Sequence, residues 1–119
     1  MAHARAALPD ECCGLLVGTT ARIDAARRAR NLDASPTRFL IDPQDHFAAL
    51  REARASGLRV VGVYHSHPST PSLPSPRDVA EASYADYLYA IVSLRAERAD
   101  VRVYRLEGGE FREESLLEV

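Results

Sequence analysis

A nearly continuous apolar run that ends in two histidines constrains the fold of this chain more than any other feature. Residues 59–65 read Arg-Val-Val-Gly-Val-Tyr-His and are the most strongly β-like in the sequence. Because so few of these positions are polar, the run predicts a buried strand at the centre of a sheet. Pro68 follows the second histidine and stops the strand. We therefore expect the end of a central strand to carry His65 and His67.

The other segments predict a mixed α/β fold in a single domain. A chain of 119 residues fits one compact domain, residues 1–119. The expected helices cover 1–8, 43–57 and 76–83, and the expected strands cover 12–18, 22–28, 38–41, 59–65, 87–93, 101–106 and 111–119. The strands at 12–18 and 22–28 are expected to form a hairpin through Thr19-Thr20, and Gly108-Gly109 a later turn. These elements predict a curved, partly antiparallel sheet flanked by two or three helices.

The helix that follows Asp42 is the most clearly marked of the three. Asp42 is expected to cap it, and Pro43 suits its first helical position. Phe47, Leu50 and Ala53 recur at three-residue spacing, so they predict the apolar face that the helix packs against the sheet.

Charge and composition exclude some classes of partner. Fifteen arginines, with no lysine, stand against 17 acidic residues and give a net charge of -2. No basic stripe is present, and a nucleic acid partner would require one, so none is expected. No apolar run approaches the ~20 residues that span a bilayer, and no secretory signal precedes the first strand. We therefore expect a cytoplasmic protein that is not bound to a membrane.

Two adjacent cysteines, Cys12 and Cys13, are the only ones in the chain. Neighbouring residues rarely achieve disulfide geometry, and two thiols are too few for a thiolate zinc site. We expect them to be a half-buried strand pair, with one side chain inward and the other outward.

A candidate metal site follows from the two histidines and a later aspartate. His65 and His67 are two residues apart on a strand, so both imidazoles point to the same side. The Pro- and Ser-rich loop after Pro68 can fold back and bring Asp78 to the same point. Two histidines and one carboxylate leave a tetrahedral zinc with an open fourth position for water, which is the arrangement of a catalytic site.

Simpler interpretations exist for each part of this pattern. A lone His-x-His occurs often by chance, and either histidine alone would only end a strand. Ser75-Pro76-Arg77-Asp78 is also a typical helix start, with Ser75 as the cap. Both interpretations of this segment hold together, because a capped first turn fixes Asp78 in place. The Ser75 hydroxyl would then have two roles, one in capping the helix and one in catalysis.

Hydrolysis at such a site also needs a base. Zinc lowers the pKa of its bound water to ~7, but a side chain must still take the proton and pass it to the leaving amine. Glu11 is the candidate, because it lies just before an apolar strand that can direct it toward the metal. Composition alone does not distinguish it from the other glutamates.

These residues resemble the JAMM metalloprotease (MPN) domain. Its motif has an upstream Glu and then His-Ser/Thr-His-Pro. Seven residues, the Pro included, separate the second His from a Ser, and two more residues separate that Ser from an Asp. Here Glu11 lies in Pro-x-Glu-x-Cys-Gly-Leu-Leu, and His67 is followed at these spacings by Ser75 and Asp78. The similarity also covers residues 39–43, 60–64 and 91–94, and it extends over nearly the whole chain.

The resemblance implies a role for each residue. His65, His67 and Asp78 would hold zinc, Glu11 would be the acid/base, and Ser75 would donate a hydrogen bond to the oxyanion. Ser66 looks like a structural neighbour that helps to orient the site. The implied fold is the cytidine-deaminase-like MPN architecture. Family members usually begin with a strand and a full helix before the Glu. An edge of the fold is therefore expected to be absent here or supplied by another subunit, as in a homodimer.

The resemblance also implies a reaction. It is the hydrolysis of an amide bond after the Gly-Gly tail of a ubiquitin-like or sulfur-carrier protein, with the tail bound by β-augmentation at a sheet edge beside the Pro-rich loop. Two alternatives remain open. Some MPN domains lack the ligands and serve as scaffolds or binding modules, and others are cell-wall peptidases that accompany phage tail proteins.

Overall fold

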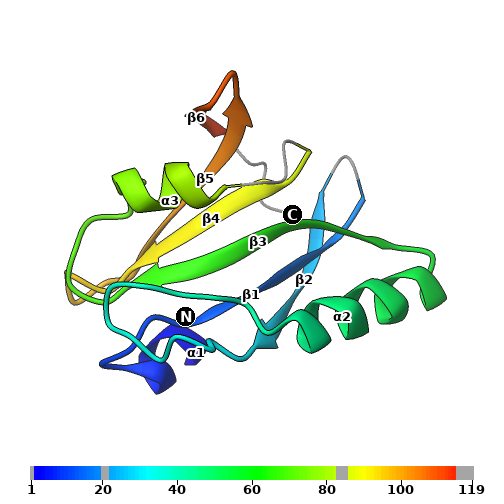
Figure 1. Ribbon diagram of the computed structural model, residues 1–119, viewed down its shortest axis with the longest axis horizontal. Helices are drawn as coiled ribbons and strands as arrows, with labels where there is room; N and C mark the ends of the chain where they lie inside the picture. The colour runs from blue at the N-terminus through cyan, green and yellow to red at the C-terminus, as the bar shows by residue number, and fades with distance from the viewer. Residues whose placement is uncertain (1, 20–21, 83–85, 115–119) are drawn as a thin grey trace.

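The computed structural model describes residues 2–19, 22–82 and 86–114. Within these ranges the chain forms three helices and six strands (Figure 1). The helices are α1 (Ala2–Ala7), α2 (Pro43–Ala55) and α3 (Pro76–Glu81). The strands are β1 (Cys13–Gly18), β2 (Ile23–Ala29), β3 (Arg59–His67), β4 (Leu88–Ser93), β5 (Asp100–Glu107) and β6 (Glu110–Glu114).

All six strands belong to one mixed sheet with the order β2-β1-β3-β4-β5-β6. β3 and β4 run parallel, and the other neighbouring pairs are antiparallel. The predicted mixed α/β class is confirmed. β3 lies inside the sheet and every residue from 60 to 67 is buried, as its apolar sequence predicts.

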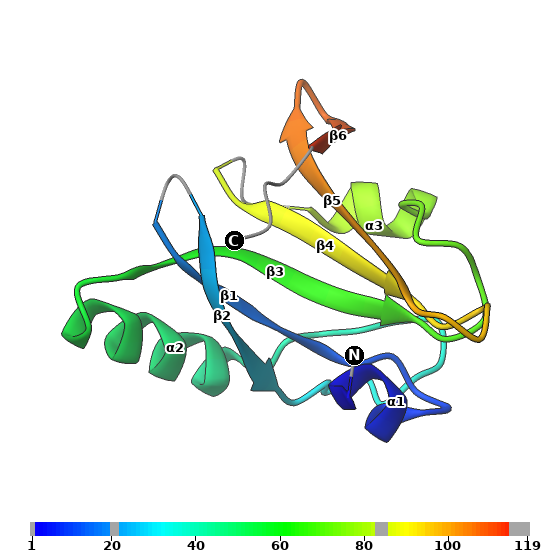
Figure 2. The same ribbon diagram turned by 180° about the vertical axis from the view of Figure 1, so that it is seen from behind.

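Helices cover both faces of the sheet, because each face carries its own apolar cluster. On one face Leu15, Val63 and Ile91 pack against Ala49 and Ala53 of α2. On the other, Leu16, Tyr64 and Val92 pack with Ala4 of α1. Figure 1 shows α2 and α3 in front of the sheet, and Figure 2 shows α1 on the opposite side. Since His65 and His67 alternate in phase with Val63, they lie on the α2 side.

The helix α2 begins as predicted, but it buries a different face. The Asp42 carboxylate accepts a hydrogen bond from the Gln44 N–H at 2.9 Å and caps the helix. The predicted apolar face is confirmed at Ala53 and wrong at the other two residues: Phe47 is 62% exposed and Leu50 is 40% exposed, whereas Ala49 and Ala53 are buried. Alanines four residues apart let the helix axis lie close to the sheet, which leaves the two large side chains beyond the contact.

The predicted strand at 38–41 is wrong, because a side chain takes the place of a neighbouring strand. The Leu40 N–H donates to the Asn31 carboxamide oxygen at 2.9 Å, and the Asn31 amide donates to the Arg38 carbonyl at 3.0 Å. Only an isolated bridge joins Asn31 to Ile41. Residues 31–41 therefore form a loop that Asn31 organises from within.

The two cysteines also differ from expectation. Their side chains point to opposite faces, but both are buried, because α1 covers the face that was expected to be open. The Cys12 side chain lies in the cluster with Ala4, and the Cys13 thiol lies 3.5 Å from the Arg30 carbonyl oxygen on the other face.

Some of the remaining predictions can be compared with the structure, and others fall on residues outside the described ranges. β1 and β2 pair as the predicted hairpin, although Thr20 lies outside the described residues. Gly108 and Gly109 have φ of 57° and 80°, so the predicted turn uses the left-handed region that favours glycine. The expected ends of the helix at 76–83 and of the strand at 111–119 also lie outside the described residues, as does Met1. No helix in the described part of the chain is long and apolar enough to cross a bilayer.

Candidate metal centre and active site

The structure brings His65, His67 and Asp78 together at the end of β3. The His65 Nε2 lies 3.2 Å from one Asp78 carboxylate oxygen, and the His67 Nε2 lies 3.1 Å from the other. The two Nε2 atoms are 3.1 Å apart. Both imidazoles are buried, with exposed fractions of 2% and 5%. Three donor atoms thus face one point, and all of them lie within 4.8 Å of one another.

The neighbourhood of His67 determines which ring nitrogen faces this point. Its Nδ1 lies 2.7 Å from the Pro71 carbonyl oxygen, which can only accept a hydrogen bond. The Nδ1–H therefore donates to Pro71, and in the neutral ring the Nε2 lone pair faces Asp78. A carbonyl partner on the far nitrogen is the usual way in which proteins orient a metal-binding imidazole.

Asp78 is held by the first turn of α3. The Ser75 hydroxyl accepts from the Asp78 N–H at 3.0 Å, and the Ser75 N–H donates to an Asp78 carboxylate oxygen at 2.8 Å. This is a complete capping box. The predicted helix start is confirmed, and it presents the Asp78 carboxylate to both histidines.

The loop between His67 and Ser75 is pinned to the end of the sheet. The Ser93 hydroxyl donates to the Thr70 carbonyl at 2.6 Å, and the Tyr104 hydroxyl donates to the Ser72 carbonyl at 2.7 Å. The Ser72 hydroxyl also donates to the Asp100 carboxylate. These contacts hold the Pro71 carbonyl against His67 even though the loop has no regular secondary structure.

The protonation states suit a metal site. Burial lowers the pKa of His65, and the Asp78 carboxylate offsets this only in part, so His65 is neutral. Burial raises the pKa of the Asp78 carboxyl, but the two imidazoles within 3.2 Å of its oxygens outweigh burial and hold that pKa well below its ordinary value. A neutral imidazole and an ionised carboxylate are the forms that bind a metal.

The pKa of His67 reports the electric field at the same point. Burial lowers it, but the hydrogen bonds with Asp78 and Pro71 and the charges of Asp78 and Glu11 raise it above its ordinary value. The surroundings therefore attract positive charge to this position. A divalent cation between the three donor atoms would meet the same field.

Glu11 lies beside this cluster. Cys13 is the register partner of His65 in the β1–β3 ladder, so a continuation of two residues places Glu11 opposite His67 on the same face. The side chain is 5% exposed, and its charge reaches His67. Its backbone is fixed on both sides, because the Glu11 N–H donates to the Ser35 carbonyl at 2.8 Å and the Asn31 amide donates to the Glu11 carbonyl at 3.0 Å.

Ser75 serves as the helix cap, and its hydroxyl can still donate a hydrogen bond of its own. A hydroxyl that accepts a hydrogen bond still has its own proton to donate. Capping and donation to a reacting oxygen are therefore compatible at this residue. Its part in catalysis stays a prediction.

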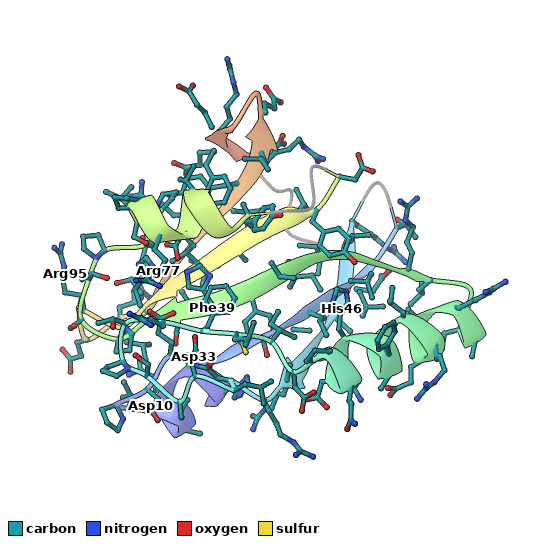
Figure 3. All side chains as sticks on the ribbon, viewed as in Figure 1. Asp10, Asp33, Phe39, His46, Arg77 and Arg95 are labelled. Carbon is teal, nitrogen blue, oxygen red and sulfur yellow. The ribbon has the colours of Figure 1, made fainter. Side chains whose placement is uncertain are left out.

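A groove of about 790 Å³ begins next to His65. Its lining residues are Asp33, Arg38, Phe39, Leu40, Ile41, Pro43, His46, Phe47, Leu50, Val63, Arg77, Tyr87 and Tyr89. The Phe39 ring stacks on the His65 imidazole, with centroids 4.3 Å apart and planes 16° apart. Figure 3 shows Phe39 and Arg77 over the end of β3, with His46 on α2 farther along the sheet. The groove therefore runs from the metal cluster over the sheet face toward α2.

Sequence reasoning missed several residues that shape this site. The sequence predicts a strand at Phe39, whereas its ring stacks on the His65 imidazole. The sequence places Pro71 in a loop but does not predict that its carbonyl bonds to His67. Neither has a local signal, because each acts through a tertiary contact. The Ser-Pro-x-Asp helix start is the exception, since its spacing alone indicates how Asp78 is held.

Comparison with known proteins identifies the family. Residues 1–107 match the family described as prokaryotic homologs of the JAB domain. The chain belongs to this family. The expected relationship to the JAMM/MPN domains is confirmed, and the match covers every residue of the candidate site.

Several curated relatives of the chain carry peptidase names. This chain is 37% identical to a desampylase of Pyrococcus furiosus over 87 residues. The aligned region covers 73% of this chain and 62% of that protein. The chain is 35% identical over 117 residues to the CysO-cysteine peptidase of Mycobacterium tuberculosis, which covers 96% of this chain and 80% of the relative. It is 38% identical over 84 residues to a probable TtuB-protein conjugate cleaving protease of Thermus thermophilus, which covers 70% of this chain and 56% of the relative.

Solved structures agree on the fold. A protein from Desulfitobacterium hafniense has a TM-score of 0.89 and 34% identity, over 98% of this chain and 83% of that one. A JAB1/MPN domain protein from Archaeoglobus fulgidus has a TM-score of 0.59 and 24% identity, over 95% of this chain and 83% of that one. The second likeness shows the fold alone, and it places the six-stranded sheet in the MPN architecture.

Proposed function

We propose that this chain is a zinc-dependent metallopeptidase that hydrolyses the amide bond after the Gly-Gly tail of a ubiquitin-like or sulfur-carrier protein. The proposal depends above all on one observation: two imidazoles and a carboxylate meet at a buried point, with Glu11 on the same face of the sheet. Two nitrogens and one oxygen are a donor set that suits zinc and leaves a coordination position open. The two buried free thiols are compatible with the reducing cytoplasm that the sequence predicts.

Each residue of the site has its own role in the proposed reaction. Zinc bound by His65, His67 and Asp78 would polarise the scissile carbonyl and acidify its water ligand. Glu11 takes the proton from the attacking water and delivers it to the leaving amine. The Ser75 hydroxyl donates its proton as a hydrogen bond to the carbonyl oxygen as negative charge develops there. Pro71 keeps the His67 ring in its metal-facing orientation throughout.

The groove supports an extended tail as the acyl part of the substrate. Phe39 leaves little room beside His65, so residues without side chains suit the metal end, and the apolar rim of α2 suits the tail farther back. The relatives' names, desampylase, CysO-cysteine peptidase and TtuB-protein conjugate cleaving protease, support a small carrier protein as the partner. Binding of the tail by β-augmentation at a sheet edge beside the Pro-rich loop stays a prediction. The groove over the sheet face offers a second path for the same tail.

The experiment is a cleavage assay with a panel of carrier proteins that end in Gly-Gly and are fused to a peptide or to a single amino acid. The zinc-loaded chain is expected to release the carrier with a free C-terminal glycine, detected by mass. The Glu11→Ala variant is expected to keep its zinc and lose turnover by about a thousandfold, because only the base is removed. Asp10→Ala, which removes the neighbouring carboxylate, is the matched control and keeps turnover.

Two results would contradict the proposal. Undiminished cleavage by Glu11→Ala would remove the assigned base. A zinc-loaded chain that cleaves no carrier in the panel would favour the scaffold or cell-wall alternatives.

A further inference from the structure

Ser66 lies between the two histidines, but it binds neither of them. Its side chain points to the opposite face of the sheet because neighbouring strand residues alternate, and it is fully buried. The Ser66 hydroxyl accepts a hydrogen bond from the Cys12 N–H at 2.8 Å, and the Ser66 N–H donates to the Cys12 carbonyl at 3.1 Å. Residues 12 and 66 are therefore joined twice across the strands.

One of these two bonds departs from a regular antiparallel ladder. In a regular hydrogen-bonded pair, both N–H groups donate to carbonyl oxygens of the opposite strand. Here the Ser66 N–H follows that rule, whereas the Cys12 N–H bonds to a side-chain hydroxyl. The strand assignment agrees, since β1 begins at Cys13 while β3 continues to His67. Figure 2 shows β1 and β3 as neighbouring strands of the sheet.

This departure lies where the chain enters β1, one residue after Glu11. The Glu11 N–H donates to the Ser35 carbonyl of the 31–41 loop, away from β3. Glu11 is thus held between that loop on one side and Cys12 on the other, and the Ser66 hydroxyl fixes Cys12. This bond connects the strand that carries the two histidines to the residue that precedes β1.

We infer that Ser66 is a positioning residue for Glu11, so that one hydroxyl keeps the base in register with the metal ligands. This inference rests on the proposed function. Loss of the hydroxyl leaves the Cys12 N–H buried without its acceptor, so the backbone at Glu11 shifts while His65, His67 and Asp78 keep their own contacts. A displacement of about 1 Å at a reacting group lowers turnover by roughly a hundredfold.

The test compares Ser66→Ala with Ser66→Thr, which retains the hydroxyl, in steady-state cleavage of a carrier–Gly-Gly fusion by the zinc-loaded chain. Ser66→Ala is expected to lower kcat by about tenfold to a hundredfold. Zinc affinity and KM are expected to stay within about twofold of wild type. Ser66→Thr is expected to restore kcat. Val103→Ala shortens a buried side chain on the same sheet face and controls for a general loss of stability, and its kcat is expected to be unchanged.

A double-mutant cycle separates positioning from a general structural effect. In a Glu11→Ala background, Ser66→Ala is expected to cause no further loss, because its effect acts through the carboxylate. An equal further loss in that background would overturn the inference. So would wild-type kcat in Ser66→Ala, or a loss that follows the loss of zinc.

A second measurement needs neither zinc nor substrate. Amide hydrogen exchange in the metal-free protein is expected to show a protected Cys12 N–H that exchanges at least about tenfold faster in Ser66→Ala, with the Leu15 N–H unchanged. Unaltered protection of Cys12 would contradict the inference. A wild-type chain that cleaves no carrier would instead contradict the proposed function, and the exchange result would still report whether Ser66 holds Cys12.

Discussion

The metal cluster and the groove beside it lie on the same face of the sheet, but the chain holds them very differently. At the cluster, each donor residue is buried or nearly so, and Pro71, Ser75 and the first turn of α3 fix its orientation. Along the groove, Phe47 and Leu50 are largely exposed and contribute little to the core. Reaction chemistry needs donor atoms that are placed before substrate arrives, whereas recognition of a protein partner needs apolar area that is still open.

The largest expected effect comes from breaking the cluster itself. His67→Ala removes one of three ligands, so zinc and turnover are expected to be lost together, with activity down by roughly a thousandfold or more. Zinc content after gel filtration and the cleavage rate measure the two losses. His3→Ala is the matched control, because His3 contacts Tyr64 on the opposite face of the sheet. Stoichiometric zinc in His67→Ala would mean that the metal lies elsewhere.

The second largest effect is expected in the groove, where the apolar side chains are exposed. Phe47→Asp places a charge on the exposed wall of the groove and is expected to raise KM for a carrier fusion about tenfold, with kcat, zinc content and Tm close to wild type. The reason is that the side chain is 62% exposed and packs little against the core. Val101→Asp, an exposed apolar position on β5 outside the groove, controls for the added charge. If both variants have wild-type KM, the groove does not bind the substrate.

The smallest effect concerns the helix that forms the groove wall. Asp42→Ala removes the cap of α2 and is expected to lower the free energy of unfolding by about 1 kcal/mol. Gln44→Ala, an exposed change in the same turn, is expected to have little effect. Urea denaturation of the metal-free proteins measures the difference. Equal stability of the two variants would show that the Asp42–Gln44 hydrogen bond contributes little.

Local spacing made much of the cluster predictable. His65 and His67 share a side because a strand repeats every two residues, and the Ser75–Asp78 spacing identifies a capping box. Both patterns act within a few residues of sequence. Glu11 needed the family resemblance, because its place just before an apolar strand does not by itself distinguish it from the other glutamates.

The groove was not predictable in the same way. The three-residue spacing of Phe47, Leu50 and Ala53 suggested a buried face, yet the tight approach of α2 to the sheet selects Ala49 and Ala53. Phe39 reaches His65 only because Asn31 folds the 31–41 segment into a loop. Contacts between distant segments decide both outcomes, and neither leaves a periodic signal in the sequence.

The most direct test of the central claim is anomalous diffraction at the zinc edge from crystals of the zinc-loaded protein. One peak is expected at about 2.0–2.1 Å from the Nε2 atoms of His65 and His67 and at a similar distance from an Asp78 carboxylate oxygen. A peak at any other group of side chains, or none at these three residues under saturating zinc, would contradict the account.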